Sequence, residues 1–201
     1  MTMAFDDLAD QSDEALLQLY ARGDRAAART LVLRLSPRVL GYATRLLADR
    51  AEAEDVAQEA MLRLWRVAPE WRTGEAQVTT WLYRVVTNLV TDRQRARQRR
   101  QATTLDDAPE VADDAPAAVA QLIEADRMAA LDRALDSLPD RQRQALVLRH
   151  FEGMSNPEIA EIMQIGVEAV ESLTARAKRA LATALGGQRE ELGYADVEGG
   201  T

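Results

Sequence analysis

The fold is decided by the stretch LPDRQRQALVLRHFEGMSNPEIAEIMQIGVEAVESLTARAKRAL, residues 138–181. Apolar side chains recur there every three or four positions in three runs, and Gly153 and Gly166 separate the runs. Pro139 suits a first helical position, where its missing N–H would be unpaired anyway. Ser155 is a typical N-cap for the middle run. The stretch therefore predicts helix, turn, helix, turn, helix.

Two helices joined by a short turn that contains glycine form a helix-turn-helix, whose second helix can enter the major groove of DNA. Similar helix pairs also occur in all-helical proteins that bind no DNA. The formal net charge of −8 does not favour DNA binding, because nucleic-acid-binding proteins are usually basic. The pattern alone leaves both interpretations open.

The charge is unevenly distributed along the chain. Residues 1–14 carry five acids and no base, residues 101–126 carry seven acids and no base, and residues 186–201 carry four acids and one base. Residues 15–100 carry 16 bases and 9 acids, whereas residues 127–185 carry 8 of each. The basic character therefore lies in the first half of the chain, and the helix-turn-helix half is neutral.

Composition excludes several classes of protein. The chain has no cysteine, a single histidine (His150) and no glycine-rich phosphate loop, so we expect no enzyme, no cofactor and no metal site. No apolar run approaches the roughly 18 residues of a membrane span, and the N-terminal residues do not show the pattern of a signal peptide. These features predict a cytoplasmic protein without direct membrane insertion.

Abundant alanine, leucine, arginine and glutamate predict an all-α fold. Residues 101–120 contain two prolines and four aspartates without a helical stripe, and this composition is typical of a flexible acidic linker. The linker is either a solvated spacer or a segment that folds back onto basic surfaces of the chain and occupies them in place of phosphate. The prediction is two small helical domains, with boundaries at 12–100 (first domain), 101–124 (linker), 125–186 (second domain) and 187–201 (acidic tail).

In the first domain we expect helices over residues 15–21, 26–47 and 51–67. The third helix has an apolar side and, opposite it, a polar stripe within about 120° of arc. Such a stripe is either a solvated face or a docking site for a basic partner. Its residues, called the acidic stripe below, are Glu52, Asp55, Gln58 and Glu59.

A loop over residues 67–80 follows, and a helix over residues 81–100 has a polar strip opposite its apolar side. Arginines can neutralise phosphates, an amide can bind a base edge, and a loop tryptophan can stack a base, so this pattern suits an unpaired nucleic-acid strand. The alternative is a tryptophan packed into the domain and arginines that are merely solvated. The residues concerned are Trp71, Arg84, Asn88, Thr91, Arg93, Arg95 and Arg97.

Three segments carry a family resemblance: DRAEAEDVAQEAMLRLWR (49–66), WLYRVVTNLVTDRQR (81–95) and residues 138–181. Together they resemble an extracytoplasmic-function (ECF) sigma factor of bacterial RNA polymerase. The first two segments are similar to sigma region 2, and the third is similar to sigma region 4. The resemblance implies an alternative sigma factor that binds core RNA polymerase and directs initiation at specific promoters.

The resemblance also implies roles. The acidic stripe would bind the clamp helices of the polymerase β′ subunit, and the second domain would contact the β flap. Trp71 would lie in the specificity loop, Asn88 in the pocket for a flipped base of the promoter −10 element, and the strip arginines along nearby DNA. The −35 element would be read by residues 155–179, in particular Ser155, Glu168, Ala169, Glu171, Ser172, Arg176, Lys178 and Arg179.

The recognition helix departs from the family pattern, which usually opens Gly-Thr-Val-Lys-Ser-Arg and here reads EAVESL over residues 168–173. Either Glu171 and Ser172 read an unusual −35 element, or the second domain binds DNA weakly. An alternative function is a sigma-like mimic that sequesters an anti-sigma factor without binding DNA. The family further implies an anti-sigma factor as a partner, one that is often anchored in the membrane and can hold the protein there.

Overall fold

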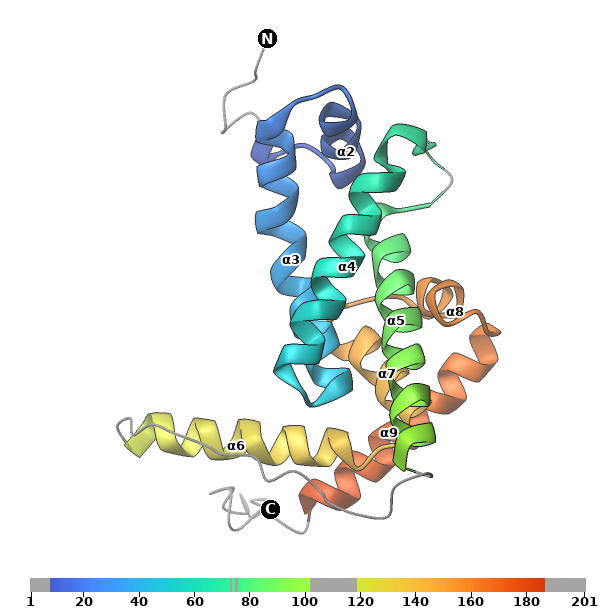
Figure 1. The fold of residues 1–201 in the computed structure, drawn as a ribbon. Coiled ribbons are helices and arrows are strands. Elements are labelled where there is room, and N and C mark those ends of the chain that lie inside the picture. Colours follow the sequence, from blue (N-terminus) through green and yellow to red (C-terminus); the bar gives the residue numbers. More distant parts are fainter. Residues whose placement is uncertain (1–7, 73, 75, 102–118, 187–201) are drawn as a thin grey trace, which may run out of the picture.

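The structure, a computed structural model, describes residues 8–72, 74, 76–101 and 119–186. Every regular element in these ranges is a helix, as the sequence predicts (Figure 1). None of these helices is long and apolar enough to cross a membrane. The predicted acidic tail and most of the predicted linker lie outside the described residues.

The first helical unit comprises α2 (Asp13–Ala21), α3 (Arg25–Leu47), α4 (Arg50–Val67), the short helix η1 (Ala68–Glu70) and α5 (Val78–Gln101). Side chains of Ser12, Asp24 and Asp49 cap the first three helices by accepting main-chain N–H bonds. This is the usual way to satisfy orphan donors at a helix start. The helix α5 begins three residues earlier than the sequence predicts.

The core of this unit lies where α3, α4 and α5 pack together. Tyr42 of α3 is fully buried there, and its hydroxyl shares a 2.9 Å hydrogen bond with that of Thr87 on α5. Burial raises the pKa of Tyr42 above its ordinary value. The buried hydroxyl pair is satisfied, and it fixes the rotation of α5 and hence the side on which its polar residues project.

The second helical unit comprises α6 (Val119–Asp136), α7 (Asp140–His150), α8 (Asn156–Met163) and α9 (Val167–Gly186). Ser155 caps α8 as predicted, and Glu158 completes a capping box with it. Pro139 is the N-cap residue of α7 rather than its first helical residue. The helix α6 begins at Val119, six residues before the predicted start of this domain.

The turn between α8 and α9 contains Gly166, but its left-handed residue is a different one. Gln164, not Gly166, adopts the left-handed backbone conformation, with a φ of 53°. Its N–H bonds the main-chain oxygens of Ala160 and Glu161, which ends α8. A left-handed residue at a helix end is usually glycine, so the sequence gives no signal for this position.

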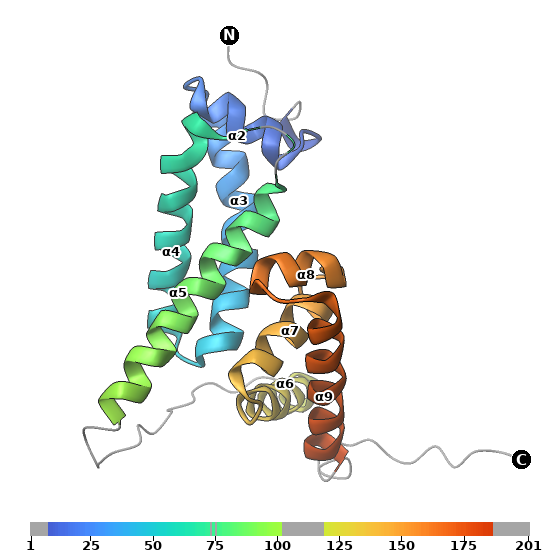
Figure 2. The same cartoon turned by 90° about the vertical axis from the view of Figure 1, so that its right-hand side faces the viewer.

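The two units pack against each other (Figures 1 and 2). The helix α8 lies against α5, and α7 lies against the C-terminal part of α3. Buried apolar side chains of both units form one continuous core cluster. The polar strip of α5 is therefore close to the second unit.

Candidate functional site

The acidic stripe lies on the outer side of α4. Asp55 and Gln58 are exposed, while Glu52 and Glu59 are half-buried. Glu59 accepts a 2.8 Å bond from Arg63, and this bond holds the pKa of its carboxyl below the usual range. The structure thus places all four residues on one accessible face.

An apolar groove lies beside the acidic stripe, between α3 and α4. Its lining includes Val32, Leu40, Met61, Leu62 and Trp65. Leu62 is 43% exposed and Val32 41% exposed, although both are large apolar side chains. Sequence reasoning missed this groove. Its signal was Leu62, which lies seven residues after Asp55 and hence on the polar side of the helix.

Trp71 is half-buried, which differs from the freely exposed ring that the loop position suggests. Its ring packs edge-on against Trp81, with centroids 5.8 Å apart and an angle of 84°. Its indole N–H donates to the Glu14 carboxylate at 3.3 Å, and the N–H of Gly74 donates to the same oxygen at 2.9 Å. Glu14, on α2, therefore anchors the loop that contains Trp71. The two residues are 57 positions apart, so the local sequence gives no signal of this contact.

The polar strip of α5 has Asn88 exposed near its centre. Arg95 and Arg97 are exposed, and Arg84 and Arg93 are half-buried. A run of arginines around one accessible amide on a single helix can bind a phosphate backbone and one base edge together.

The strip opens into two clefts. One cleft is lined by Asn88, Thr91 and Arg95 together with residues of α7 and α8. The other brings Arg84 beside Trp71 and Trp81. The structure thus brings Arg84, Asn88, Thr91 and Arg95 together along one side of α5, and the hydroxyl of Thr91 is already used in a 2.7 Å bond to the main-chain oxygen of Thr87. Arg93 and Arg97 lie on another side of α5, where they line a cleft with Leu46 and Glu52.

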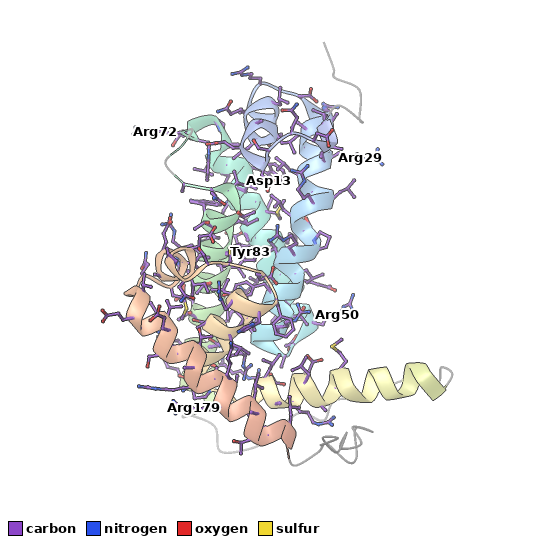
Figure 3. The ribbon with its side chains drawn as sticks, turned by 180° about the vertical axis from the view of Figure 1, so that it is seen from behind. Asp13, Arg29, Arg50, Arg72, Tyr83 and Arg179 are labelled. Atoms are coloured by element: carbon purple, nitrogen blue, oxygen red, sulfur yellow. The ribbon has the colours of Figure 1, made fainter. Side chains whose placement is uncertain are left out.

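The helix α9 buries one side and exposes the other. Val170, Thr174 and Ala177 are buried on the side of α9 that packs against the other helices of the second unit. The predicted −35 residues of this helix are all exposed: Glu168, Ala169, Glu171, Ser172, Arg176, Lys178 and Arg179. Arg179 lies at the opposite end of the molecule from Arg72 and Asp13 (Figure 3).

Two predicted −35 residues already have partners within the protein. The hydroxyl of Ser155 donates to Glu158 at 2.6 Å, and bonds from the Ser155 hydroxyl and N–H hold the pKa of Glu158 below its usual range. The side-chain amide of Asn156 donates to Glu171 at 3.4 Å. Carboxylates therefore lie at or near the N-termini of both helices of the helix-turn-helix.

Family models match both helical units. Sigma-70 region 2 matches residues 31–100, within the first unit, and sigma-70 region 4 matches residues 128–181, within the second. The Pseudomonas aeruginosa RNA polymerase sigma-H factor is 34% identical over 186 residues, which cover 89% of this chain and 96% of that protein. The Mycobacterium tuberculosis ECF RNA polymerase sigma factor SigM is 34% identical over 178 residues, covering 88% and 86%.

Two solved complexes contain chains with a similar fold. The sigma factor RpoE in complex with the anti-sigma factor NepR from Bartonella quintana matches with a TM-score of 0.67 and 23% identity, over 79% of this chain and 96% of that one. CnrH in complex with the cytosolic domain of CnrY matches with a TM-score of 0.66 and 23% identity, over 88% and 99%. With its two sigma regions in order and relatives along nearly its whole length, the chain belongs to the ECF sigma factors of bacterial RNA polymerase: it is an alternative sigma factor that directs promoter-specific transcription initiation.

Proposed function

We propose that this sigma factor divides its work among three surfaces. The acidic stripe of α4 binds the β′ clamp helices of core RNA polymerase, α5 and the Trp71 loop bind the −10 element, and α9 reads the −35 element while the second unit contacts the β flap. All three surfaces act by binding, without covalent chemistry by this chain.

The observation that carries this proposal is the position of Asn88. Its side chain is exposed one helical turn after Arg84, and it lines the cleft that also contains Thr91 and Arg95. Extruding one base from the duplex costs a few kcal/mol. Contacts of the base with Asn88, together with phosphate neutralisation by Arg84 and Arg95 on the same side of α5, offset that cost.

The packing of Trp71 changes the role that we propose for it. Because its ring rests on Trp81 and its N–H binds Glu14, Trp71 supports the loop at the edge of the cleft that also contains Arg84. A base inserted at this point meets the accessible part of a fixed aromatic wall, which lowers the entropy lost on binding.

An anti-sigma factor is the second partner that we propose. Two structural neighbours are complexes, one with the anti-sigma factor NepR and the other with the cytosolic domain of CnrY. The apolar groove between α3 and α4, rimmed by the acidic stripe, suits an amphipathic helix with basic flanks. Such a helix would compete with core polymerase for α4 and hold the sigma factor inactive, at the membrane if the anti-sigma factor is anchored there.

Run-off transcription tests the three-surface assignment. Core polymerase and this protein are incubated with a library of promoter fragments, and transcripts are sequenced. We expect transcripts from a subset that shares −10 and −35 sequences. Absence of any transcript above core polymerase alone would contradict the assignment, and so would a transcript set without a shared −10 sequence.

A further inference from the structure

One carboxylate oxygen ties the loop that contains Trp71 to α2. The Oε1 atom of Glu14 accepts from the indole N–H of Trp71 at 3.3 Å and from the main-chain N–H of Gly74 at 2.9 Å. The two donors lie three residues apart, so a single acceptor bridges the first part of the loop. The contact therefore fixes a side chain and the main chain of the loop together.

The helix that carries Glu14 is itself held at both ends. The carboxylate of Asp13 lies 2.6 Å from the guanidinium of Arg34 on α3, and Arg34 also donates to the main-chain oxygen of Gln11 at 2.9 Å. At the other end of α2, the ring centroid of Tyr20 lies 4.6 Å from that of Trp65 on α4. Figure 1 shows α2 packed beside α3. Glu14 is therefore presented to the loop from a fixed support.

Gly74 gives the loop a defined shape at the point where it meets Glu14. Its backbone lies in the left-handed region, with a φ of 82°. Residues with a side chain rarely adopt this conformation, whereas glycine does so freely. A Cβ atom added to Gly74 would meet no atom of the described residues within 4 Å beyond its chain neighbours. Glycine is therefore required here by the backbone conformation and not by a lack of space.

Two contacts set the orientation of the Trp71 ring. Its edge-on contact with Trp81 buries apolar surface, but such contacts tolerate a range of ring tilts. The hydrogen bond from its N–H to Glu14 depends more strongly on angle, so it determines which edge of the ring faces α2. Trp71 and Arg84 line the same cleft. Glu14 therefore orients one wall of that cleft from outside it.

A wall that is fixed before a base arrives affects both affinity and selectivity. Loops are usually more mobile than helices, and a mobile wall must be ordered when the base binds. That ordering costs conformational entropy, which weakens the binding of every base. A mobile wall also adapts to bases of different shape, so the preference for one base falls. Loss of Glu14 should reduce both quantities, whereas a general loss of stability should leave the preference among bases unchanged.

We propose that Glu14 is a positioning residue for −10 recognition: it touches no DNA, and it holds Trp71 and Gly74 in the arrangement that receives one base. This proposal rests on the assignment of the Trp71 loop to the −10 element. It adds α2, which lies outside the three binding surfaces, to the parts of the chain that determine promoter choice.

Solvent exchange of indole N–H groups, measured by heteronuclear NMR on the full chain, tests the contact without DNA. The chain has three tryptophans, and W71F identifies the signal of Trp71. We expect Glu14→Ala to speed the exchange of this N–H by roughly three- to tenfold, as the loss of one hydrogen bond of ordinary net strength implies. Glu14→Gln should stay within about twofold of the parent, because its amide oxygen still accepts from both donors.

Promoter opening by the holoenzyme gives the functional readout. A set of promoter fragments carries each base in turn at the flipped position of the −10 element, and permanganate reactivity measures open complexes. We expect E14A to form roughly three- to tenfold fewer open complexes on the preferred fragment, with a smaller ratio between preferred and disfavoured fragments. E14Q should keep both values near the parental ones. The affinity for core polymerase should be the same in all variants.

Matched variants separate positioning from overall stability. Asp13→Ala removes the neighbouring carboxylate and its contact with Arg34 but leaves the loop contact in place, so it should lower thermal stability and keep the parental indole exchange and base preference. Gly74→Ala strains the loop while Glu14 is intact, and it should lower the preference as E14A does. Gly153→Ala imposes a similar strain in the second unit, at a φ of 71°, and should keep the parental preference.

The outcomes separate this proposal from the one on which it rests. Parental indole exchange in E14A would overturn the positioning role, and so would an equal loss of base preference in E14A, D13A and G153A. If W71A lowers promoter opening and E14A does not, Trp71 reads the promoter without Glu14, and the positioning role also fails. If E14A speeds the exchange but neither E14A nor W71A changes opening or preference, the contact is real, the assignment of the loop to the −10 element is wrong, and the positioning role falls with it. Faster exchange together with a lower base preference in E14A and G74A supports both proposals.

Discussion

Arg143 of α7 reaches the main-chain oxygen of Leu46 at the C-terminal end of α3, with its Nη1 atom 3.2 Å from that oxygen. The same guanidinium donates to the main-chain oxygen of Asp136 at 2.5 Å and lies 3.0 Å from the Asp136 carboxylate. Arg143 is only 8% exposed, so one buried cation joins the end of α6 to the first helical unit. The burial of a charge requires such partners.

Replacing this cation should therefore destabilise the protein. We expect Arg143→Met to lower the free energy of unfolding by about 1–3 kcal/mol, because Leu46 and Asp136 lose a charged donor. Urea unfolding followed by circular dichroism measures the change. Arg141→Met removes an exposed arginine of the same helix and should change the value by less than about 0.5 kcal/mol. Equal midpoints for the two variants would contradict this role of Arg143.

Charge reversal on the acidic stripe should weaken the binding of core polymerase. Asp55 is exposed, so Asp55→Arg places a cation on the proposed docking face without disturbing the core. We expect at least a tenfold weaker affinity for core polymerase, since like charges repel across an interface. Asp132→Arg makes the same change on the exposed side of α6 and should keep the parental affinity. Fluorescence titration of labelled sigma factor with core polymerase compares the two, and equal affinities would remove Asp55 from this interface.

Asn88→Ala should separate polymerase binding from promoter opening. Asn88 lies on α5, away from the acidic stripe, so we expect the affinity for core polymerase to be unchanged. Open complexes should become about tenfold fewer, because the variant loses the energy of about one base contact. Permanganate reactivity of unpaired thymines measures opening. Gln98→Ala, an exposed amide further along the same helix, is the control. If both variants open the promoter as well as the parent, Asn88 does not bind a flipped base.

The helices could be predicted because their signals are local. Asp24 after Gly23, and Ser155 three residues before Glu158, mark helix starts whatever the rest of the chain does. The start of α6 at Val119 was missed because prolines and aspartates just upstream favoured a linker as far as residue 124. The alanine, leucine and glutamate among residues 119–124 are good helix formers, and they extend α6 into the predicted linker.

The site could be predicted only where it follows one helix. Asn88 and its neighbouring arginines share a face by periodicity alone. The bonds of Glu14 to the Trp71 loop and of Glu152 to Tyr83 join residues 57 and 69 positions apart. Such pairs depend on how helices pack, and no local pattern in a single sequence encodes them.

Removing the charge of Glu158 should destabilise the protein in a pH-dependent way. Its pKa is lowered by bonds from Ser155, so the charged form is favoured in the folded state. The stabilisation is present above the ordinary carboxyl pKa and is lost as the pH falls through the lower folded pKa. We expect Glu158→Gln to cost about 0.3–1 kcal/mol at pH 7 and less at pH 4, just below the ordinary glutamate pKa of about 4.3. Urea unfolding at both pH values tests this, with Asp132→Asn as a control that should show no such difference.

Glu171 decides between the two interpretations of the recognition helix. Its carboxylate is exposed and accepts from Asn156 at 3.4 Å, so it is held beside the N-terminus of α8. There it can accept from a cytosine amino group, or it can repel a phosphate. If Glu171 reads a base, Glu171→Lys changes the preferred −35 sequence at one position in holoenzyme transcription from a randomised promoter library. If it only repels, the variant transcribes more strongly from the same sequences, with a steeper loss of activity as salt rises.

The control for this experiment is Glu168→Lys, which makes the same charge change one turn earlier on the exposed side of α9. A purely electrostatic effect is shared by the two variants, because both add a cation to the same face of the helix. A change of base preference confined to Glu171→Lys assigns sequence reading to Glu171. Unchanged preference and strength in Glu171→Lys would remove this residue from the promoter contact, and sequence reading would then belong to other exposed polar residues of α9, among them Ser172, Arg176 and Arg179.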